Sequence, residues 1–502
     1  MNILEELKKN DKMELINEVI VRQNLLRHFF TSKYHRLRVI LFYIKRFIYL
    51  TLLKDFKNKF RDTFRVKKVL KTGNKNKNSI KVLYDFQTFT AQKVGGISRL
   101  FFEIIKDLSK DKEVKPELAL RYSDNIYLKN ASFFADKKTK KIITENPPPL
   151  RHFEEIIPPS PFLEDSLLIN FFRKFFLKIL SLKYITPGTS FSSLKGPWYY
   201  TYYEANLKTA INFLKKGDFD VFHPTYYDTY FLKYLRGKPF VLTIHDMIHE
   251  KYSYYHHPND VISNQKKILA QKAKKIIAVS SQTKKDIIEI LKISAEKIVV
   301  IPHASKFNNK KLKNIKIKGL PKKYFLFVGQ RVTYKNFNFF IKAIAPILRK
   351  EKDLYMVCVG DFPSSGPFTD DELNLFKRLK ISKKMIYYRA DDDILAYLYS
   401  KAYAFVFPTL AEGFGIPVLE AFSLGCPVLC SDIPVLREVA EDGALYFNPK
   451  SQKSIQKAVG KILKDKRLRY NLINKGKKIN KKYSWKKTAE SYKKVYLEIF
   501  NG

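Results

Sequence analysis

Two glutamates, Glu412 and Glu420, flank a glycine-rich turn in the stretch LAEGFGIPVLEAFSLG, residues 410–425. Carboxylates are strong hydrogen-bond acceptors, and vicinal sugar hydroxyls are good donors to them. Gly413 and Gly415 let the backbone approach a ligand closely. These residue types predict a site that grips hydroxyl groups, with one acid holding a sugar and the other a ribose.

A short helix is expected directly after this turn. Pro417 suits the first helical position and Gly425 the C-terminal cap, so PVLEAFSL is the predicted helix, with Glu420 on its first turn. Amides at a helix start can donate to hydroxyls or to phosphate oxygens. The amides expected to do so are those of Phe414, Ile416 and Val418. The alternative is that Glu420 only interacts favourably with the helix dipole.

Two cations precede a second expected helix, residues 337–350. Arg331 and Lys335 lie in QRVTYKN, and Asn336 suits the N-cap position. Cations beside a helix N-terminus form an anion site suited to a diphosphate. In so basic a chain the alternative is that both side chains are merely solvated.

His245 follows a predicted strand in TIHDMIHE, where a buried pair with Asp246 is the alternative to a role in chemistry. Gly95 and Gly96 lie in a loop before an amphipathic helix, and a simple tight turn is the alternative there. Arg389 ends a strand and is expected near a nucleotide base. Other polar residues, the run ADDD (390–393) with Ser280 and Ser281, are expected to cap helices rather than to bind metal.

Short apolar strands alternate with helices along most of the chain, which predicts α/β architecture with parallel sheets. Five strands are expected in a first series, at residues 81–86, 219–224, 239–246, 274–280 and 297–304. Six are expected in a second series, at 324–329, 355–360, 384–389, 403–408, 427–431 and 444–448. Two tandem Rossmann-like domains leave a central cleft at the carboxyl ends of both sheets, where ligands bind.

We predict four segments from this pattern: a basic helical arm with a linker (1–79), an N-terminal Rossmann-like domain (80–305), a C-terminal Rossmann-like domain (306–483) and a helix that returns to the N-terminal domain (484–502). Residues 145–190 look like an insertion in the first domain. Basic aromatic segments at 36–54 and 171–183 can lie on an anionic membrane surface, or pack on the protein itself.

The net charge of +46, from 94 basic and 48 acidic residues, fits nucleic acid, an anionic membrane or an anionic small substrate. Lysine far outnumbers arginine, although nucleic-acid recognition favours arginine, so no nucleic-acid partner is expected. Cys358, Cys426 and Cys430 form no CxxC motif, which indicates a reducing compartment. No signal peptide is apparent, and the apolar segment 39–53 is too short and too charged to span a bilayer.

The motif EGFGIPVLEA, an E-x7-E pair, resembles the retaining nucleotide-sugar glycosyltransferases of family 4, which have the GT-B fold. The stretches VGGISRLFFEI, VGQRVTYKN and 398–449 agree, so the resemblance covers roughly residues 80–500 and leaves out the arm. The forms YKN and TIHD look most like the mannosyltransferase branch.

This resemblance implies roles for the candidate residues. Arg331 and Lys335 would bind the donor diphosphate, and Gly95 and Gly96 would lie near the diphosphate and acceptor. His245 would lie near the transferred sugar and assist binding or stabilise developing positive charge. The sugar and ribose would be held by the donor-binding set Glu412, Gly413, Phe414, Gly415, Ile416, Val418 and Glu420.

We therefore expect a cytoplasmic, membrane-peripheral, retaining hexosyltransferase in surface polysaccharide synthesis. It would move a hexose, with mannose favoured, from a nucleotide-diphospho-sugar to a glycan or lipid-linked glycan, with no cofactor and no metal. The alternatives are an epimerase or phosphorylase of similar fold, or a non-enzymatic binder of membranes or polyanions. The base, sugar, acceptor, linkage and oligomeric state stay open.

Overall fold

The computed structural model describes residues 79–123, 125–129, 195–252, 260–308, 312–313, 315–360 and 367–502. Nearly all of them belong to one compact unit, Asn78–Pro258 with Gln265–Gly502. The arm up to residue 78, the insertion 145–190 and both basic aromatic segments lie outside the described residues. Within the described ranges, no helix has the length and apolar character needed to cross a membrane.

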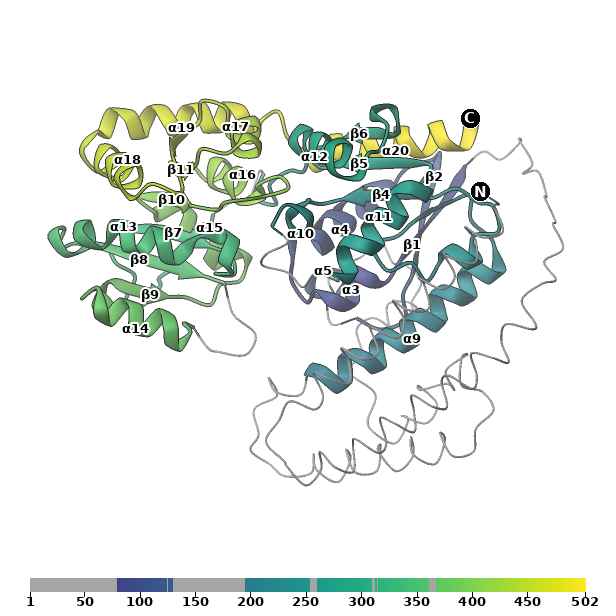
Figure 1. Ribbon diagram of the computed structural model, residues 1–502, viewed down its shortest axis with the longest axis horizontal. Helices are drawn as coiled ribbons and strands as arrows, with labels where there is room; N and C mark the ends of the chain where they lie inside the picture. Colours follow the sequence, from purple (N-terminus) through teal and green to yellow (C-terminus); the bar gives the residue numbers. More distant parts are fainter. Residues whose placement is uncertain are drawn as a thin grey trace, which may run out of the picture. The chain divides into compact units, whose positions relative to one another are not determined.

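The described N-terminal half is built on short parallel strands, hydrogen-bonded in the orders β2-β1-β3 and β4-β5-β6 (Figure 1). A parallel bridge between Phe222 and Phe240 brings β3 beside the start of β4. The strands are β1 (Ile80–Asp85), β2 (Val114–Ala119), β3 (Val221–His223), β4 (Val241–Ile244), β5 (Lys275–Ala278) and β6 (Ile298–Val300). The helices are α3 (Gln87–Ala91), α4 (Gly96–Leu108), α5 (Ile126–Lys129), α9 (Lys195–Lys216), α10 (Ile248–Lys251), α11 (Val261–Lys272) and α12 (Ser281–Leu291).

Strand β2 is an element that the sequence pattern did not reveal. Its sequence VKPELA contains Pro116 and has exposed residues between its buried ends. Proline cannot donate a ladder hydrogen bond, so it is tolerated mainly at a sheet edge. The position of β2 at the edge of its sheet explains both the proline and the weak apolar pattern.

The C-terminal half contains a parallel sheet of order β12-β11-β10-β7-β8-β9. All six strands predicted for this half are present: β7 (Lys323–Val328), β8 (Leu354–Val359), β9 (Met385–Tyr387), β10 (Ala404–Phe407), β11 (Val428–Ser431) and β12 (Ala444–Phe447). The order reverses between β7 and β10, which is the position where doubly wound sheets bind ligands. The expected α/β architecture with two parallel Rossmann-like sheets is confirmed.

Helices cover both faces of this second sheet. Tyr324 and Leu326 of β7 pack into one buried cluster, while Phe325 and Phe327 pack into another, because successive side chains of a strand point to opposite faces. The helices of this half are α13 (Phe337–Lys350), α14 (Asp370–Arg378), α15 (Asp392–Lys401), α16 (Ile416–Ser423), α17 (Pro434–Ala440), α18 (Gln452–Lys464) and α19 (Lys466–Asn480).

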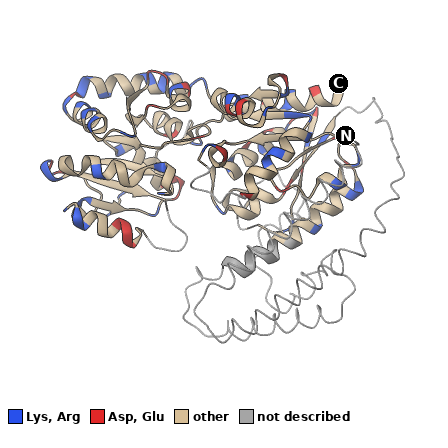
Figure 2. Ribbon diagram, in the orientation of Figure 1, with Lys and Arg blue, Asp and Glu red and all other residues tan. Residues whose placement is uncertain are grey.

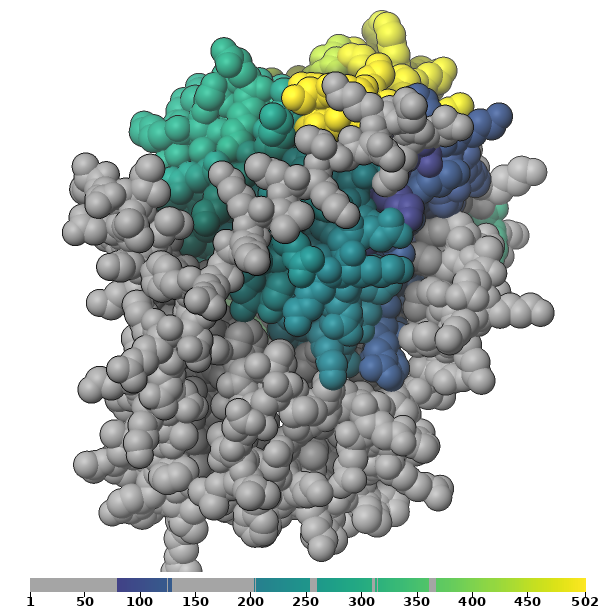
Figure 3. All heavy atoms as spheres, turned by 90° about the vertical axis from the view of Figure 1, so that its right-hand side faces the viewer, coloured from purple at the N-terminus to yellow at the C-terminus, as the bar shows by residue number. Residues whose placement is uncertain are grey.

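Helix α20 (Trp485–Asn501) packs on the N-terminal half, against α4, β1 and β3. In Figure 3 its yellow atoms lie beside the blue atoms of the first described segment. The Tyr496 hydroxyl hydrogen-bonds both the Tyr84 hydroxyl and Nδ1 of His223, each over 2.7 Å. These buried polar contacts fix the helix against β1 and β3 at one position.

Charge is distributed unevenly over this scaffold. Lysine and arginine residues are spread over helices of both halves, whereas acidic residues gather on the first turn of α14 (Figure 2). One of those acids, Glu372, is buried. Glu372 pairs with Arg331, one of the candidate site residues.

Candidate functional site

The loops that follow β7 and β10 meet where the strand order reverses. The backbone N–H of Leu410 donates to the carbonyl of Tyr334 over 2.7 Å. This contact brings Lys335 and Glu412 together, and Nζ of the lysine donates to Oε1 of the glutamate over 2.6 Å. Their side chains are 17% and 12% exposed, so a ligand can reach both. A cation suited to phosphate thus lies beside a carboxylate suited to hydroxyls.

Arg331 is placed differently from the expectation of an open cation at a helix mouth. Its side chain is 0% exposed, and Nε donates to Oε1 of Glu372 over 2.7 Å. Its other nitrogens donate to the carbonyls of Gly360 and Pro367, and its guanidinium lies 5.0 Å from the centre of the Phe368 ring. The guanidinium therefore joins the loops after β7 and β8 to the start of α14, inside the protein.

Asn336 precedes α13, but its side chain does not cap the helix. The residue has φ of +58° and its amide nitrogen donates to the carbonyl of Pro449 over 2.9 Å. Asn336 thus occupies the expected N-cap position, but its side chain bonds to another loop and makes no capping hydrogen bond.

Helix α16 begins at Ile416, one residue earlier than expected, after Gly415 with φ of +114°. That backbone conformation favours glycine. Pro417 still lies in the first turn, but Glu420 falls on the second, so its expected place on the first turn is wrong. The N–H of Val418 donates to the carbonyl of Gly415 over 2.9 Å. This amide, expected to be open to a ligand, is therefore used within the helix start.

Gly413 leaves no room for a side chain. A Cβ atom there would collide with the carbonyl oxygen of His245 and lie 3.0 Å from Cβ of Asp246. The next residue, Phe414, is buried, and its ring meets that of His303 edge to face at 5.2 Å. The glycine-rich turn and the loop after β4 are thus in direct backbone contact.

The two glycines of the N-terminal half lie close to this turn. A Cβ atom at Gly96, the first residue of α4, would be 3.7 Å from Cδ1 of Ile416. Gly95 has an extended backbone, and a side chain there would collide with Gln92, whose Oε1 accepts the N–H of Ser98 over 3.0 Å. The start of α4 therefore faces the start of α16.

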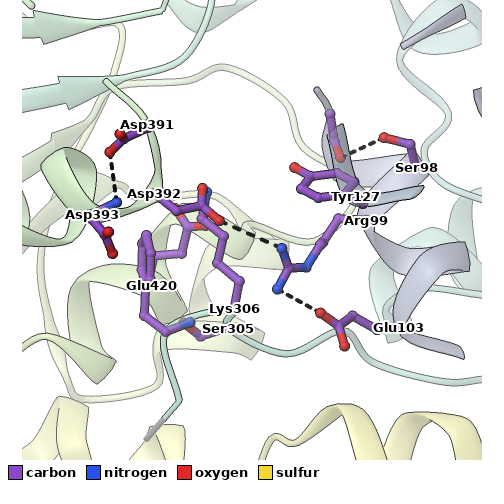
Figure 4. Close-up of polar contacts among 12 residues, drawn as sticks. Ser98, Arg99, Glu103, Tyr127, Ser305, Lys306, Asp391, Asp392, Asp393 and Glu420 are labelled. Atoms are coloured by element: carbon purple, nitrogen blue, oxygen red, sulfur yellow. Dashed lines mark hydrogen bonds and ion pairs between the residues drawn. The ribbon is translucent and has the colours of Figure 1, made fainter. Parts of the chain in front are cut away.

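Glu420 lies in a second charged cluster, with Lys306 and Asp392 (Figure 4). It accepts a hydrogen bond from the Tyr399 hydroxyl (3.2 Å), and Nζ of Lys306 lies 3.7 Å from its other oxygen. Lys306 also donates to Asp392 over 2.7 Å, and Arg99 of α4 lies 3.7 Å from the same carboxylate. Burial raises the pKa of Glu420, and the charge of Lys306 opposes that rise. The lysine thus favours the charged form of a buried acid.

The remaining candidates either cap helices or lie exposed on the surface. Asp391 caps α15 by accepting the N–H groups of Asp393 and Ile394 over 2.9 and 2.8 Å, so the capping interpretation of ADDD is confirmed. Ser280 caps α12 as expected, whereas Ser281 is the first residue of that helix and not its cap. Arg389 is exposed after β9.

His245 is buried, but it does not form the hydrogen-bonded pair with Asp246 that was the alternative. Asp246 instead accepts the N–H of Ile248 over 3.0 Å. Nε2 of His245 has no hydrogen-bond partner among the described residues. Burial, assisted by the charge of Lys266, lowers the pKa of His245 to about 3. The ring is therefore neutral at physiological pH.

A pH profile tests this assignment of His245. Because the pKa of its ring is about 3, kcat should show no inflection from this residue near its ordinary value of about 6.5. On the role that the family resemblance implies for His245, the substitution His245→Asn should lower kcat about tenfold at every pH between about 5 and 8, which is the cost of one lost hydrogen bond. Steady-state kinetics over that range measure both. An inflection near pH 6.5 that disappears in His245→Asn would contradict the neutral ring.

Two protein-family models match this chain. Models of the families described as "Glycosyltransferase Family 4" and "Glycosyl transferases group 1" match residues 182–304 and 308–479. The O-antigen chain mannosyltransferase RfbU of Salmonella typhimurium is 31% identical over 307 residues, which cover 58% of this chain and 78% of that protein. The chain belongs to glycosyltransferase family 4. The expected enzyme class, a hexosyltransferase of this family, is confirmed.

The family-4 glycosyltransferase has further relatives. It is 28% identical to the O-antigen chain mannosyltransferase B of Escherichia coli over 256 residues, which cover 47% of this chain and 66% of that protein. The crystal structure of Anabaena Alr3699/HepE in complex with UDP and glucose matches with a TM-score of 0.56 and 14% identity, and covers 83% of this chain and 99% of that one. At that identity the likeness supports the GT-B fold alone.

Sequence reasoning missed three residues of this cluster in the glycosyltransferase: Lys306 and Tyr399, which contact Glu420, and Arg99, which contacts Asp392. Lys306 lies in a lysine-rich stretch and Tyr399 in an apolar helix, and neither carries a local signal of function. Arg99 stands three residues after the second glycine of VGGISR, and the sequence indicates no role for it. Its contact with Asp392 joins residues that are far apart along the chain, so the sequence could not reveal it.

Proposed function

We propose that this glycosyltransferase moves a hexose, with mannose favoured, from a nucleoside-diphosphate sugar to a glycan or lipid-linked glycan, with retention at the anomeric carbon. The observation that carries the proposal is the Lys335–Glu412 contact of 2.6 Å at the reversal of strand order. One side chain is chemically suited to the diphosphate and the other to the sugar hydroxyls, and they are adjacent as these groups are in the donor.

The diphosphate would bind between Lys335 and the facing starts of α4 and α16. Helix N-termini carry partial positive charge and favour phosphate groups. These two termini lie close together, since a Cβ atom added at Gly96 would be 3.7 Å from Cδ1 of Ile416. Arg331 would act from within the fold, because it holds the loop that carries Lys335.

The sugar would be held by Glu412 and the amides of Phe414, Gly415 and Ile416. The ribose would be held by Glu420, whose charged form accepts hydroxyl protons most strongly. Lys306 opposes the effect of burial on Glu420 and so supports that form. Each glutamate of the E-x7-E pair thus has its own lysine.

In the proposed transfer, the bond between the anomeric carbon and the diphosphate oxygen breaks, and a bond to the acceptor oxygen forms on the same face. The acceptor proton passes to the departing diphosphate, so no protein base is required. Lys335 and the helix termini stabilise the charge that develops on the leaving group. The neutral ring of His245 would stabilise positive charge on the sugar.

Mannose as the sugar and a surface polysaccharide as the product are supported by the relatives, both of which are named O-antigen chain mannosyltransferases. The basic chain also fits an anionic membrane surface on the cytoplasmic face as a partner. The sugar, the product and the membrane partner are all parts of this proposal.

One experiment tests sugar, stereochemistry and membrane dependence. GDP-mannose, UDP-glucose and UDP-N-acetylglucosamine are compared by thermal shift and then offered with a bacterial membrane extract, with and without anionic vesicles. GDP-mannose should raise the melting temperature most, since a ligand that binds only the folded state stabilises it. NMR of the product should show the anomeric configuration of the donor. Transfer of another sugar, or inversion, would contradict the proposal.

A further inference from the structure

The carbonyl of Gly413, in the glycine-rich turn, is held by two hydroxyl groups of the N-terminal half. Oγ of Ser280 and Oγ1 of Thr283 donate to this oxygen over 2.7 and 3.0 Å. Both residues are buried, at 0% and 2% exposure. A carbonyl oxygen has two lone pairs and can accept both protons. The N–H of Thr283 donates in turn to Oγ of Ser280 over 3.0 Å. The serine proton has two acceptors within reach, the carbonyl of Gly413 at 2.7 Å and Oγ1 of Thr283 at 3.0 Å, and the carbonyl is the closer.

A second contact fixes the same end of α12. The carboxylate of Glu438, on α17, accepts the N–H groups of Ser281 and Gln282 over 2.7 and 3.1 Å. Amides at a helix start have no partner within the helix, and a negative charge there is favourable. The start of α12 is therefore attached to the C-terminal half at two separate points.

These contacts determine the orientation of one peptide group. Because a trans peptide is planar, the N–H of Phe414 points opposite to the carbonyl of Gly413. The hydroxyl groups hold that carbonyl on one side, and the backbone of His245 lies against the Cα of Gly413. The peptide between Gly413 and Phe414 is thus prevented from rotating.

We propose that Ser280 and Thr283 are positioning residues, which hold this peptide so that the N–H of Phe414 is directed at the donor sugar. The inference rests on the proposed function, in which that amide binds the sugar, and it adds a requirement. The hydroxyl groups and the carbonyl belong to different halves of the molecule, so the amide is correctly directed only while the two halves are in contact.

The substitution Thr283→Val tests the proposal, because it removes one hydroxyl, keeps the shape of the side chain and leaves the Ser280 cap in place. We expect kcat for sugar transfer to fall about tenfold, since small errors in the position of binding groups are costly. The dissociation constant of the nucleoside diphosphate, which lacks the sugar, should stay within about twofold. Thr283→Ser restores the hydroxyl and should restore kcat.

Ser451→Ala is a control for a general loss of stability. Ser451 caps α18 by the same kind of bond that Ser280 makes in α12, so its loss should lower the melting temperature without changing kcat. If Thr283→Val keeps kcat within about twofold of Thr283→Ser, or loses nucleoside diphosphate affinity in parallel with kcat, the positioning role is wrong.

Hydrogen exchange separates this inference from the proposed function. Amides of residues 409–415 should exchange about tenfold faster in Thr283→Val than in the wild type and in Thr283→Ser, because the loop opens more often. Equal exchange rates overturn the inference whatever sugar is transferred. Failure of the wild type to transfer any sugar overturns the proposed function, while the exchange rates still decide the role of Thr283.

Discussion

Replacing Glu412 with alanine is expected to lower kcat by about 100- to 1,000-fold, the usual cost of removing a group that acts directly on the reacting substrate. The substitution removes the carboxylate proposed to hold the sugar and leaves Lys335 without its 2.6 Å partner. The melting temperature should change little, because both side chains are partly exposed. Transfer kinetics and calorimetry on the same preparations measure the two effects.

Asp442→Ala supplies a matched control for this prediction. It removes an exposed carboxylate that lies 2.9 Å from Lys475, and exposed pairs contribute about 1 kcal/mol or less. Its kcat should equal that of the wild type. If the Glu412→Ala enzyme retained more than about a tenth of the activity, Glu412 would not have the proposed direct contact with the sugar.

Replacing Arg331 with methionine is expected to lower the free energy of unfolding by about 3–5 kcal/mol, because it leaves the buried Glu372 carboxylate without its ion partner. The two side chains are 0% and 3% exposed and lie 2.7 Å apart. Denaturant unfolding followed by circular dichroism measures the change. Combining Arg331→Met with Glu372→Leu should recover much of the loss, since an apolar pair can replace a buried ion pair.

This prediction also decides between two roles of Arg331. A residue that binds the diphosphate directly would lose affinity for the nucleoside diphosphate with little change in stability. A residue that holds the loop from within would lose stability, and the double variant would regain it. Normal stability together with lost affinity would restore the role that the family resemblance implies.

Most of the fold could be predicted because its signal is local. The six strands of the C-terminal half are short apolar runs, and all six were identified from such runs. Gly425, predicted to end α16, follows it with φ of +69°. Strand β2 was missed because an edge strand with Pro116 lacks a continuous apolar run.

The site was predicted less completely, because its contacts depend on residues distant along the chain. Lys335 and Glu412 could be identified, since each follows a strand that ends at the same edge of the sheet. The Arg331–Glu372 contact could not, because two cations close together in the sequence suggest one shared ligand, whereas the acid that binds one of them is 41 residues away. Lys306 carries no local signal that marks it as the partner of Glu420.

The return of α20 to the N-terminal half has a consequence for synthesis on the ribosome. The C-terminal half, from β7 to α19, is one continuous stretch, and its sheet is complete before α20 is made. The N-terminal half still lacks Tyr496 at that moment, so Tyr84 and His223 have no hydroxyl partner from this helix. Domains generally fold as units while the chain emerges. The half that is translated first is therefore expected to finish folding last.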